Sequence, residues 1–106
     1  MDRKTFYAES STALRHIDEV LGDLEHDQLD VDLAGDVLTL AFEDGGKFII
    51  NAHSAAEQIW MAAGTTAWHF DYVPERNQWI ASKTDDELMA TVARVVGDKL
   101  GQAVEL

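Results

Sequence analysis

The chain has 106 residues, of which 46% are hydrophobic, and this size suits one globular domain over residues 1–106 with a single core. Its formal net charge of -12 repels phosphate backbones and anionic lipid, which argues against nucleic acid and membranes as partners. Because it has no cysteine, disulfides, thiolate nucleophiles, zinc-thiolate sites and iron-sulfur clusters held by its own side chains are excluded.

The first predicted element is an amphipathic helix from Thr5 to about Glu25. Its apolar residues recur at spacings of three and four, as a single buried stripe requires. These residues are Phe6, Ala13, Leu14, Ile17, Val20, Leu21 and Leu24. At 100° per residue, Glu19, Asp23 and His26 lie roughly opposite the stripe and should face water.

Six short strands are predicted to follow. The runs are 29–33, 37–42, 48–50, 57–63, 68–73 and 78–81. The first run, LDVDL, alternates strictly, which places Asp30 and Asp32 on one face and its apolar residues on the other. Short turns rich in glycine, or carrying the single proline, separate the runs. This spacing predicts an antiparallel meander.

The last predicted element is a helix that opens with TDDE, residues 84–87. This pattern is typical of a capping box, in which the Thr84 hydroxyl accepts from the Glu87 amide and the Glu87 carboxylate accepts from the Thr84 amide. Apolar spacing continues to Leu100, with Gly97 as a weak point and Gly101 as a natural stop. The short apolar tail beyond it could pack against a helix.

The element order predicts an α+β fold. We expect a two-layer α/β sandwich with the N- and C-terminal helices on one face of an antiparallel sheet of about six strands, leaving the other face to solvent or a partner. In the fourth strand, Ile59 and Met61 share one face, and Gln58 and Trp60 share the other. Trp60 is therefore expected to be an exposed binding anchor, with His69 beside it. The alternative is a tryptophan partly buried at a sheet edge.

The segment 16–36 contains eight acidic residues and no lysine or arginine. A charge run is usually a solvated face, but a solubilising face normally mixes signs to limit repulsion. Because these acids occupy a helix and the strand after it, they should form one contiguous ridge. Carboxylate oxygens are hard ligands that suit iron, manganese, magnesium or calcium, although the ligand spacing of a calcium loop is absent.

Conventional catalytic motifs do not occur in the sequence. The histidines are His16, His26, His53 and His69, and they show no metal-ligand spacing. Each alone is more readily structural or surface-exposed, with His26 a weak candidate for a secondary metal ligand near Asp23. The phosphate-binding loop and the nucleophile elbow are also missing, which disfavours an enzyme that transforms a substrate.

The first ten residues, MDRKTFYAES, lack the apolar stretch that a secretion signal contains. No apolar run approaches the roughly 20 residues needed to span a bilayer. We therefore expect a soluble, cytoplasmic protein.

The motifs DVLTLAF, EDGGKFIIN, EQIWMA, AWHFDY and QWIAS, preceded by the acidic segment, resemble the frataxin family in its bacterial, CyaY form. The resemblance covers nearly the whole chain, and the order of VLTL, an asparagine, QIW and HFD is fairly specific. Three departures are visible, and one of them is a helix-to-strand loop about one residue shorter than in the family. Gly22 stands where bacterial relatives often carry another acid, and residues 52–57 lack the basic residue, glutamine and proline that the family often places there.

The resemblance implies an α/β sandwich that weakly binds ferrous or ferric iron, with other divalent cations possible, and that takes part in iron-sulfur cluster assembly. It implies that the ridge docks on a basic surface of cysteine desulfurase, and that the sheet face around the tryptophan contacts the assembly machinery, including the scaffold protein. The acidic ridge carried over in this way comprises Asp18, Glu19, Asp23, Glu25, Asp27, Asp30 and Asp32. The sheet-face residues are Asn51, Gln58 and Trp60.

Three hypotheses follow. The first is an iron-binding regulator or iron supplier for cluster assembly, expected to be a monomer that iron could oligomerise. The second is a metal-independent acidic protein-interaction module that steers a basic partner electrostatically. The third is a ferroxidase, against which the lack of a Glu-x-x-His pair of the di-iron kind argues.

Overall fold

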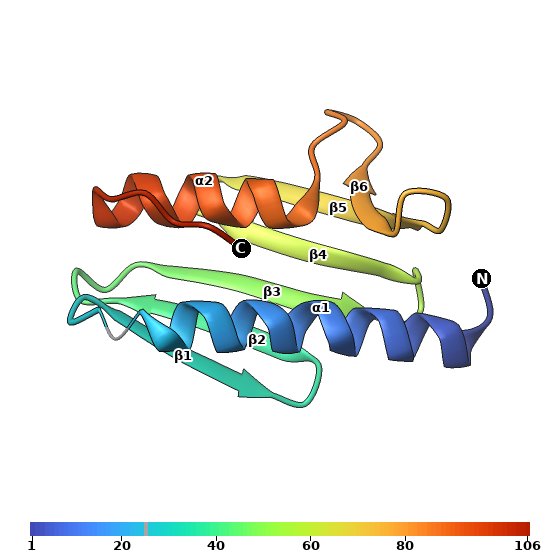
Figure 1. The fold of residues 1–106 in the computed structure, drawn as a ribbon, viewed down its shortest axis with the longest axis horizontal. Coiled ribbons are helices and arrows are strands. Elements are labelled where there is room, and N and C mark those ends of the chain that lie inside the picture. Colours follow the sequence, from blue (N-terminus) through green and yellow to red (C-terminus); the bar gives the residue numbers. More distant parts are fainter. Residues whose placement is uncertain (25) are drawn as a thin grey trace.

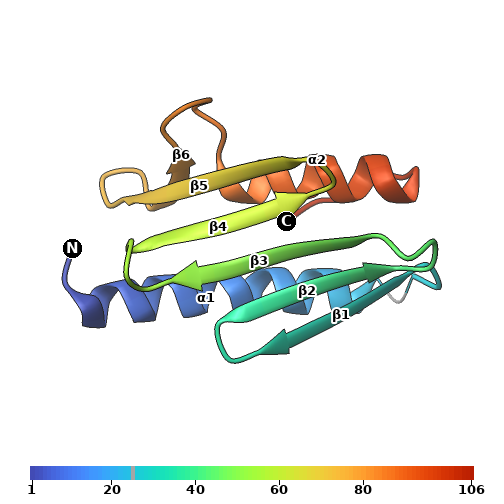
Figure 2. The same cartoon turned by 180° about the vertical axis from the view of Figure 1, so that it is seen from behind.

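Two helices lie alongside each other on one face of a six-stranded antiparallel sheet in the computed structural model, which describes residues 1–24 and 26–106 (Figure 1). The elements are α1 Arg3–Asp23, β1 Leu29–Ala34, β2 Val37–Phe42, β3 Lys47–His53, β4 Gln58–Ala63, β5 Thr66–Val73, β6 Gln78–Ala81 and α2 Leu88–Leu100. The strands lie in chain order from β1 to β6. Seen from behind, the sheet turns its other face away from both helices (Figure 2). The predicted α+β sandwich is confirmed.

Alternation along the strands builds the core. Every second side chain of β2, β3 and β4 is buried toward the helices. These residues meet the buried stripe of α1, which includes Phe6, Leu14 and Ile17, and that of α2, which includes Leu88 and Val92. β3 extends to His53, beyond the predicted 48–50, because the small Ala52 continues its buried row. None of the helices in residues 1–24 and 26–106 is long and apolar enough to cross a membrane.

The first helix begins and ends two residues earlier than predicted. Asp2 caps it, since its Oδ1 accepts a hydrogen bond from the Thr5 amide at 2.7 Å. The prediction that His26 lies on the helical face is wrong. His26 lies in the turn before β1, where its Nδ1 accepts a hydrogen bond from the Gln28 amide at 3.1 Å and its carbonyl accepts from the Leu29 amide.

The predicted capping box at the start of α2 is wrong. The helix begins at Leu88, and the N-cap is Glu87, whose carboxylate accepts hydrogen bonds from the Met89 and Ala90 amides at 2.7 and 3.0 Å. The residues before it cannot be helical because Asp85 has a φ of 62° and Glu87 forms a β-bridge with Ile80. A side chain that satisfies two free amides fixes the helix start.

Gly101 ends α2 as predicted. It adopts the left-handed conformation with a φ of 71°, and the amides of Gly101 and Gln102 both donate to the Gly97 carbonyl. Gly97 leaves room for the C-terminal tail to fold back against α2, because a Cβ there would lie 2.8 Å from the Gln102 carbonyl oxygen. The tail then packs Val104 and Leu106 against the core, as expected.

We predict that Glu87→Ala lowers the free energy of unfolding by about 1 kcal/mol, because two amides of α2 lose their acceptor. The matched variant Thr84→Ala should cost clearly less, since the Thr84 hydroxyl bonds to Asp86, whose amide lies 3.4 Å away, and not to the two α2 amides that Glu87 caps. Urea denaturation of the two variants measures the difference. An equal or larger loss from Thr84→Ala would contradict the observed cap.

A second prediction concerns acid. Hydrogen bonds from Thr84 and from the Trp68 indole hold the pKa of Asp86 below its usual 3.8. A lowered pKa means that the stabilisation by Asp86 is complete above the unfolded-state pKa and disappears as pH falls through the folded-state pKa. Asp86→Asn should therefore have a lower melting temperature than the unaltered protein at neutral pH. The difference between the two melting temperatures should disappear between about pH 5 and about pH 2. Asp85→Asn is the control, and a gap independent of pH would refute this assignment.

Candidate functional site

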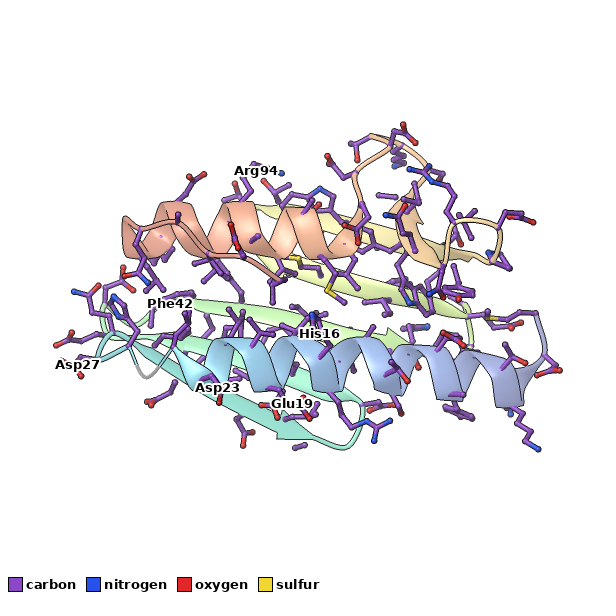
Figure 3. All side chains as sticks on the ribbon, viewed as in Figure 1. His16, Glu19, Asp23, Asp27, Phe42 and Arg94 are labelled. Carbon is purple, nitrogen blue, oxygen red and sulfur yellow. The ribbon has the colours of Figure 1, made fainter. Side chains whose placement is uncertain are left out.

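The six described residues of the acidic ridge lie along one edge of the molecule. Three lie on α1, Asp27 lies in the turn that follows, and two lie on the edge strand β1. Figure 3 shows Glu19 and Asp23 on the side of α1 that overhangs β1, with Asp27 at the end of the same edge. All are exposed except Asp18, which is partly buried. The predicted ridge residue Glu25 lies outside the described residues.

The described ridge carboxylates have no lysine or arginine partner. Across residues 1–24 and 26–106, the single ion pair joins Lys99 of α2 to Asp44 of the β2–β3 turn. There, Lys99 also lies over the Phe42 ring at 5.6 Å and holds the pKa of Asp44 below its usual range. The charge of Lys99 is therefore paired with Asp44, and the described ridge carboxylates keep their negative charge unneutralised.

The six described ridge residues do not form a preformed metal centre. Asp30 and Asp32 alternate with the inward-facing residues of β1 and so point toward the sheet face away from the helices, whereas Glu19 and Asp23 belong to the helical layer. Within the described part of the chain, no three histidine, aspartate or glutamate side chains come together as a possible metal site. These described donors can attract cations, but they are not gathered around one point.

The second candidate region is the open face, meaning the sheet face turned away from the helices. Asn51, Trp60 and His69 are paired in register across β3, β4 and β5, and His53, Gln58 and Asp71 form the adjacent row. Because Ile59 and Met61 are buried toward the helices, Gln58 and Trp60 lie on the open face, as the alternation predicted.

Trp60 is only half-buried, although it lies on an interior strand and not at an edge. Its indole lies between two imidazoles, with ring centroids 3.9 Å from His53 and 4.3 Å from His69 and interplanar angles of 17° and 13°. The expected sheet face of Trp60 is correct, but the expected exposure is wrong, because the ring is half-buried and two histidines cover both of its sides.

Hydrogen bonds complete this cluster. The Trp60 Nε1 donates to Gln58 Oε1 at 2.7 Å, and the Gln58 Nε2 donates to Asp71 Oδ1 at 3.0 Å. The His53 Nδ1 accepts from the Ala56 amide at 3.3 Å. His69 was expected on this face, but the part played by His53 was missed because the predicted strand stopped at residue 50. Two-residue alternation from Asn51 was the available signal.

Comparison with known proteins identifies the family. A family profile described as the frataxin-like domain matches residues 1–102. The iron-sulfur cluster assembly protein CyaY of Thioalkalivibrio sulfidiphilus is 41% identical over 78 residues, which are 74% of this chain and 73% of that protein. The frataxin structure from Psychromonas ingrahamii superimposes with a TM-score of 0.89 at 26% identity, covering 99% of this chain and 97% of that one.

A trimeric frataxin from the yeast Saccharomyces cerevisiae, described as complexed with ferrous, matches with a TM-score of 0.77 at 24% identity over 89% of this chain and 87% of its own. At that identity it supports the fold alone. The profile spans nearly the whole chain, and the bacterial relative agrees with it. This chain belongs to the frataxin family.

Proposed function

We propose that this protein is an iron-binding component of iron-sulfur cluster assembly that regulates the pathway or supplies iron to it, docking on cysteine desulfurase through the acidic ridge. Family membership and the name of the Thioalkalivibrio relative support the pathway. Without cysteine the chain cannot hold a cluster by thiolates, so its proposed role is to influence cluster assembly on other proteins. The observation that carries the proposal is the row of carboxylates on α1 and β1 without a basic partner among the described residues.

Iron is the proposed cargo of the ridge. Its carboxylates offer hard oxygen donors, which suit ferrous and ferric iron and other hard divalent cations. Since no three of the described donors converge, binding should be weak and readily reversed, as iron delivery or sensing requires. Iron is the metal proposed because the chain belongs to the frataxin family, in which the yeast protein is described as complexed with ferrous.

The same carboxylates would attract a basic protein surface. A strongly negative edge on a chain with a net charge of -12 raises the association rate with a basic partner, and the effect weakens as salt is added. Because the cation and the partner would use the same carboxylates, iron occupancy should compete with or tune docking on the desulfurase.

The open face is the proposed second contact, with the scaffold protein of the pathway. Asn51, Gln58 and Trp60 lie together there across β3 and β4. A tryptophan surrounded by satisfied polar groups is a common centre of a protein interface. Asn51, Gln58 and Trp60 are not ridge residues, although Asp30 and Asp32 of the ridge point to the same sheet face from the β1 edge, so the two contacts involve different residues.

The alternative is a metal-independent interaction module, which the scattered ridge donors favour. Anaerobic titration with micromolar ferrous iron, followed by NMR, separates the two functions. The first proposal expects paramagnetic broadening confined to signals near residues 18–32. Diffuse, salt-like changes over the whole surface would support the module.

We predict that changing Asp18, Glu19 and Asp23 together to Asn, Gln and Asn weakens both iron and desulfurase binding by about tenfold or more, because each of the three charges should contribute about 0.5 kcal/mol. The same change should raise the melting temperature, because it removes repulsion between like charges on one edge. Calorimetric titration and thermal unfolding measure the two effects.

The matched control neutralises three exposed acids outside the ridge, with Glu43→Gln, Glu75→Gln and Asp98→Asn. It changes the net charge by the same amount but should leave both affinities close to those of the unaltered protein. If the control weakens binding as much as the ridge variant, net charge and not the ridge is responsible.

A further inference from the structure

The function proposed above gives no role to the two imidazoles that enclose Trp60. We propose that His53 and His69 are positioning residues of the open-face contact, which hold the indole so that only its edge meets the scaffold protein. The inference rests on the proposed function, because it takes its partner from that proposal. It adds two residues to the contact and specifies the chemistry of the surface that docks there.

The stacking geometry determines how Trp60 can be used. Both faces of the indole are covered by rings at 3.9 and 4.3 Å, and its N–H is bonded to Gln58. An aromatic ligand or an arginine cannot stack on a face that is already occupied. The free part of the ring is its C–H edge, which fits a flat apolar protein surface better than a small aromatic molecule or a cation.

The cluster is also rigid before any partner arrives. Two stacked rings and the hydrogen-bonded series from Trp60 through Gln58 to Asp71 fix the indole orientation. A large side chain that is fixed in the free protein loses little conformational entropy on binding. Its polar atoms already have partners, so covering them costs little desolvation free energy. Both effects favour binding at this position.

The remaining polar groups indicate the partner's chemistry. Since His53 Nδ1 accepts from the Ala56 amide, the neutral ring carries its proton on Nε2 as a free donor. Beside the cluster, an open groove of about 460 Å³ is lined by Gln58, His69, Ser82 and Lys83, among others. Lysine ammonium and imidazole N–H groups pair with carboxylate or carbonyl oxygens. The groove side of the Trp60 cluster therefore suits a flat apolar surface bordered by acceptors, unlike the basic surface proposed for the ridge, whose Asp30 and Asp32 lie at the β1 edge of this face.

The experiment measures scaffold binding calorimetrically for the full chain and its variants. His53→Ala and His69→Ala should each weaken binding about 3- to 10-fold, the range expected for loss of one aromatic stacking contact. His53→Phe and His69→Phe keep a stacking ring and should restore most of the affinity. Trp60→Ala sets the full loss, and His16→Ala is the control that removes an imidazole from the helical layer.

A second measurement does not involve the partner. ¹⁵N relaxation of the Trp60 indole N–H should report increased motion in both alanine variants, and near-native order in both phenylalanine variants. Unchanged order in the alanine variants overturns the positioning role. Lys83→Glu should weaken scaffold binding, and tighter binding by this variant overturns the acceptor-bordered partner.

The outcomes distinguish the inference from the proposed function. If Trp60→Ala loses binding but both histidine-to-alanine variants bind normally, the inference alone fails. If the unaltered protein does not bind the scaffold, or if Trp60→Ala binds as tightly as the unaltered protein, the open-face contact itself fails and the inference falls with it.

Discussion

Both helices bury their apolar stripes against the same face of the sheet, and the position of every candidate functional side chain depends on this one-sided packing. Ile59 and Met61 enter the core, so the intervening Trp60 must project from the other face. A one-residue slip of β4 would exchange these sets and bury Gln58 without its partner. The buried row of β4 therefore fixes the open-face cluster as firmly as the contacts within it.

The acidic ridge reduces the stability that this packing provides. Its like charges repel one another and lower the stability of the fold, with no described lysine or arginine to offset them. Two of its members have a structural use, however. Asp30 and Asp32 lie on β1, an edge strand of the sheet, where charged side chains discourage pairing with another chain. The α1 carboxylates are therefore the cleaner probe of iron and partner binding, because their removal leaves the edge strand protected.

Repeating patterns in the sequence were enough to predict the architecture. The stripe of α1 and the alternation of β1 to β4 each involve many residues, so one exceptional position does not hide them. The start of α2 depends on single contacts instead. Thr84 and Glu87 have the spacing of a capping box, but the Ile80–Glu87 bridge and the left-handed Asp85 shift the helix start by three residues. A tertiary contact of this kind has no signal in local sequence.

The acidic ridge and the Trp60 cluster also differ in how far the sequence could predict them. Membership of the predicted ridge follows from residue type and from the element that carries each acid, and both could be read from the sequence. The cluster around Trp60 combines residues of β3, β4 and β5 that are up to 18 positions apart, from His53 to Asp71. Judging each histidine by its own neighbours in sequence therefore treated His53 and His69 as unrelated, although strand pairing places them on opposite faces of one indole.

The placement of the two regions bears on how partners could combine. The α1 carboxylates lie in the helical layer at the β1 edge, whereas the Trp60 cluster lies on the opposite sheet face over β3 to β5. Both helices cover only one face of the sheet (Figures 1 and 2). Their chemistry also differs, because one region offers negative charge and the other offers an aromatic edge with N–H donors. A basic partner held by the α1 carboxylates leaves the Trp60 cluster uncovered, so two proteins could bind together. Iron on the ridge would then affect only the first of them.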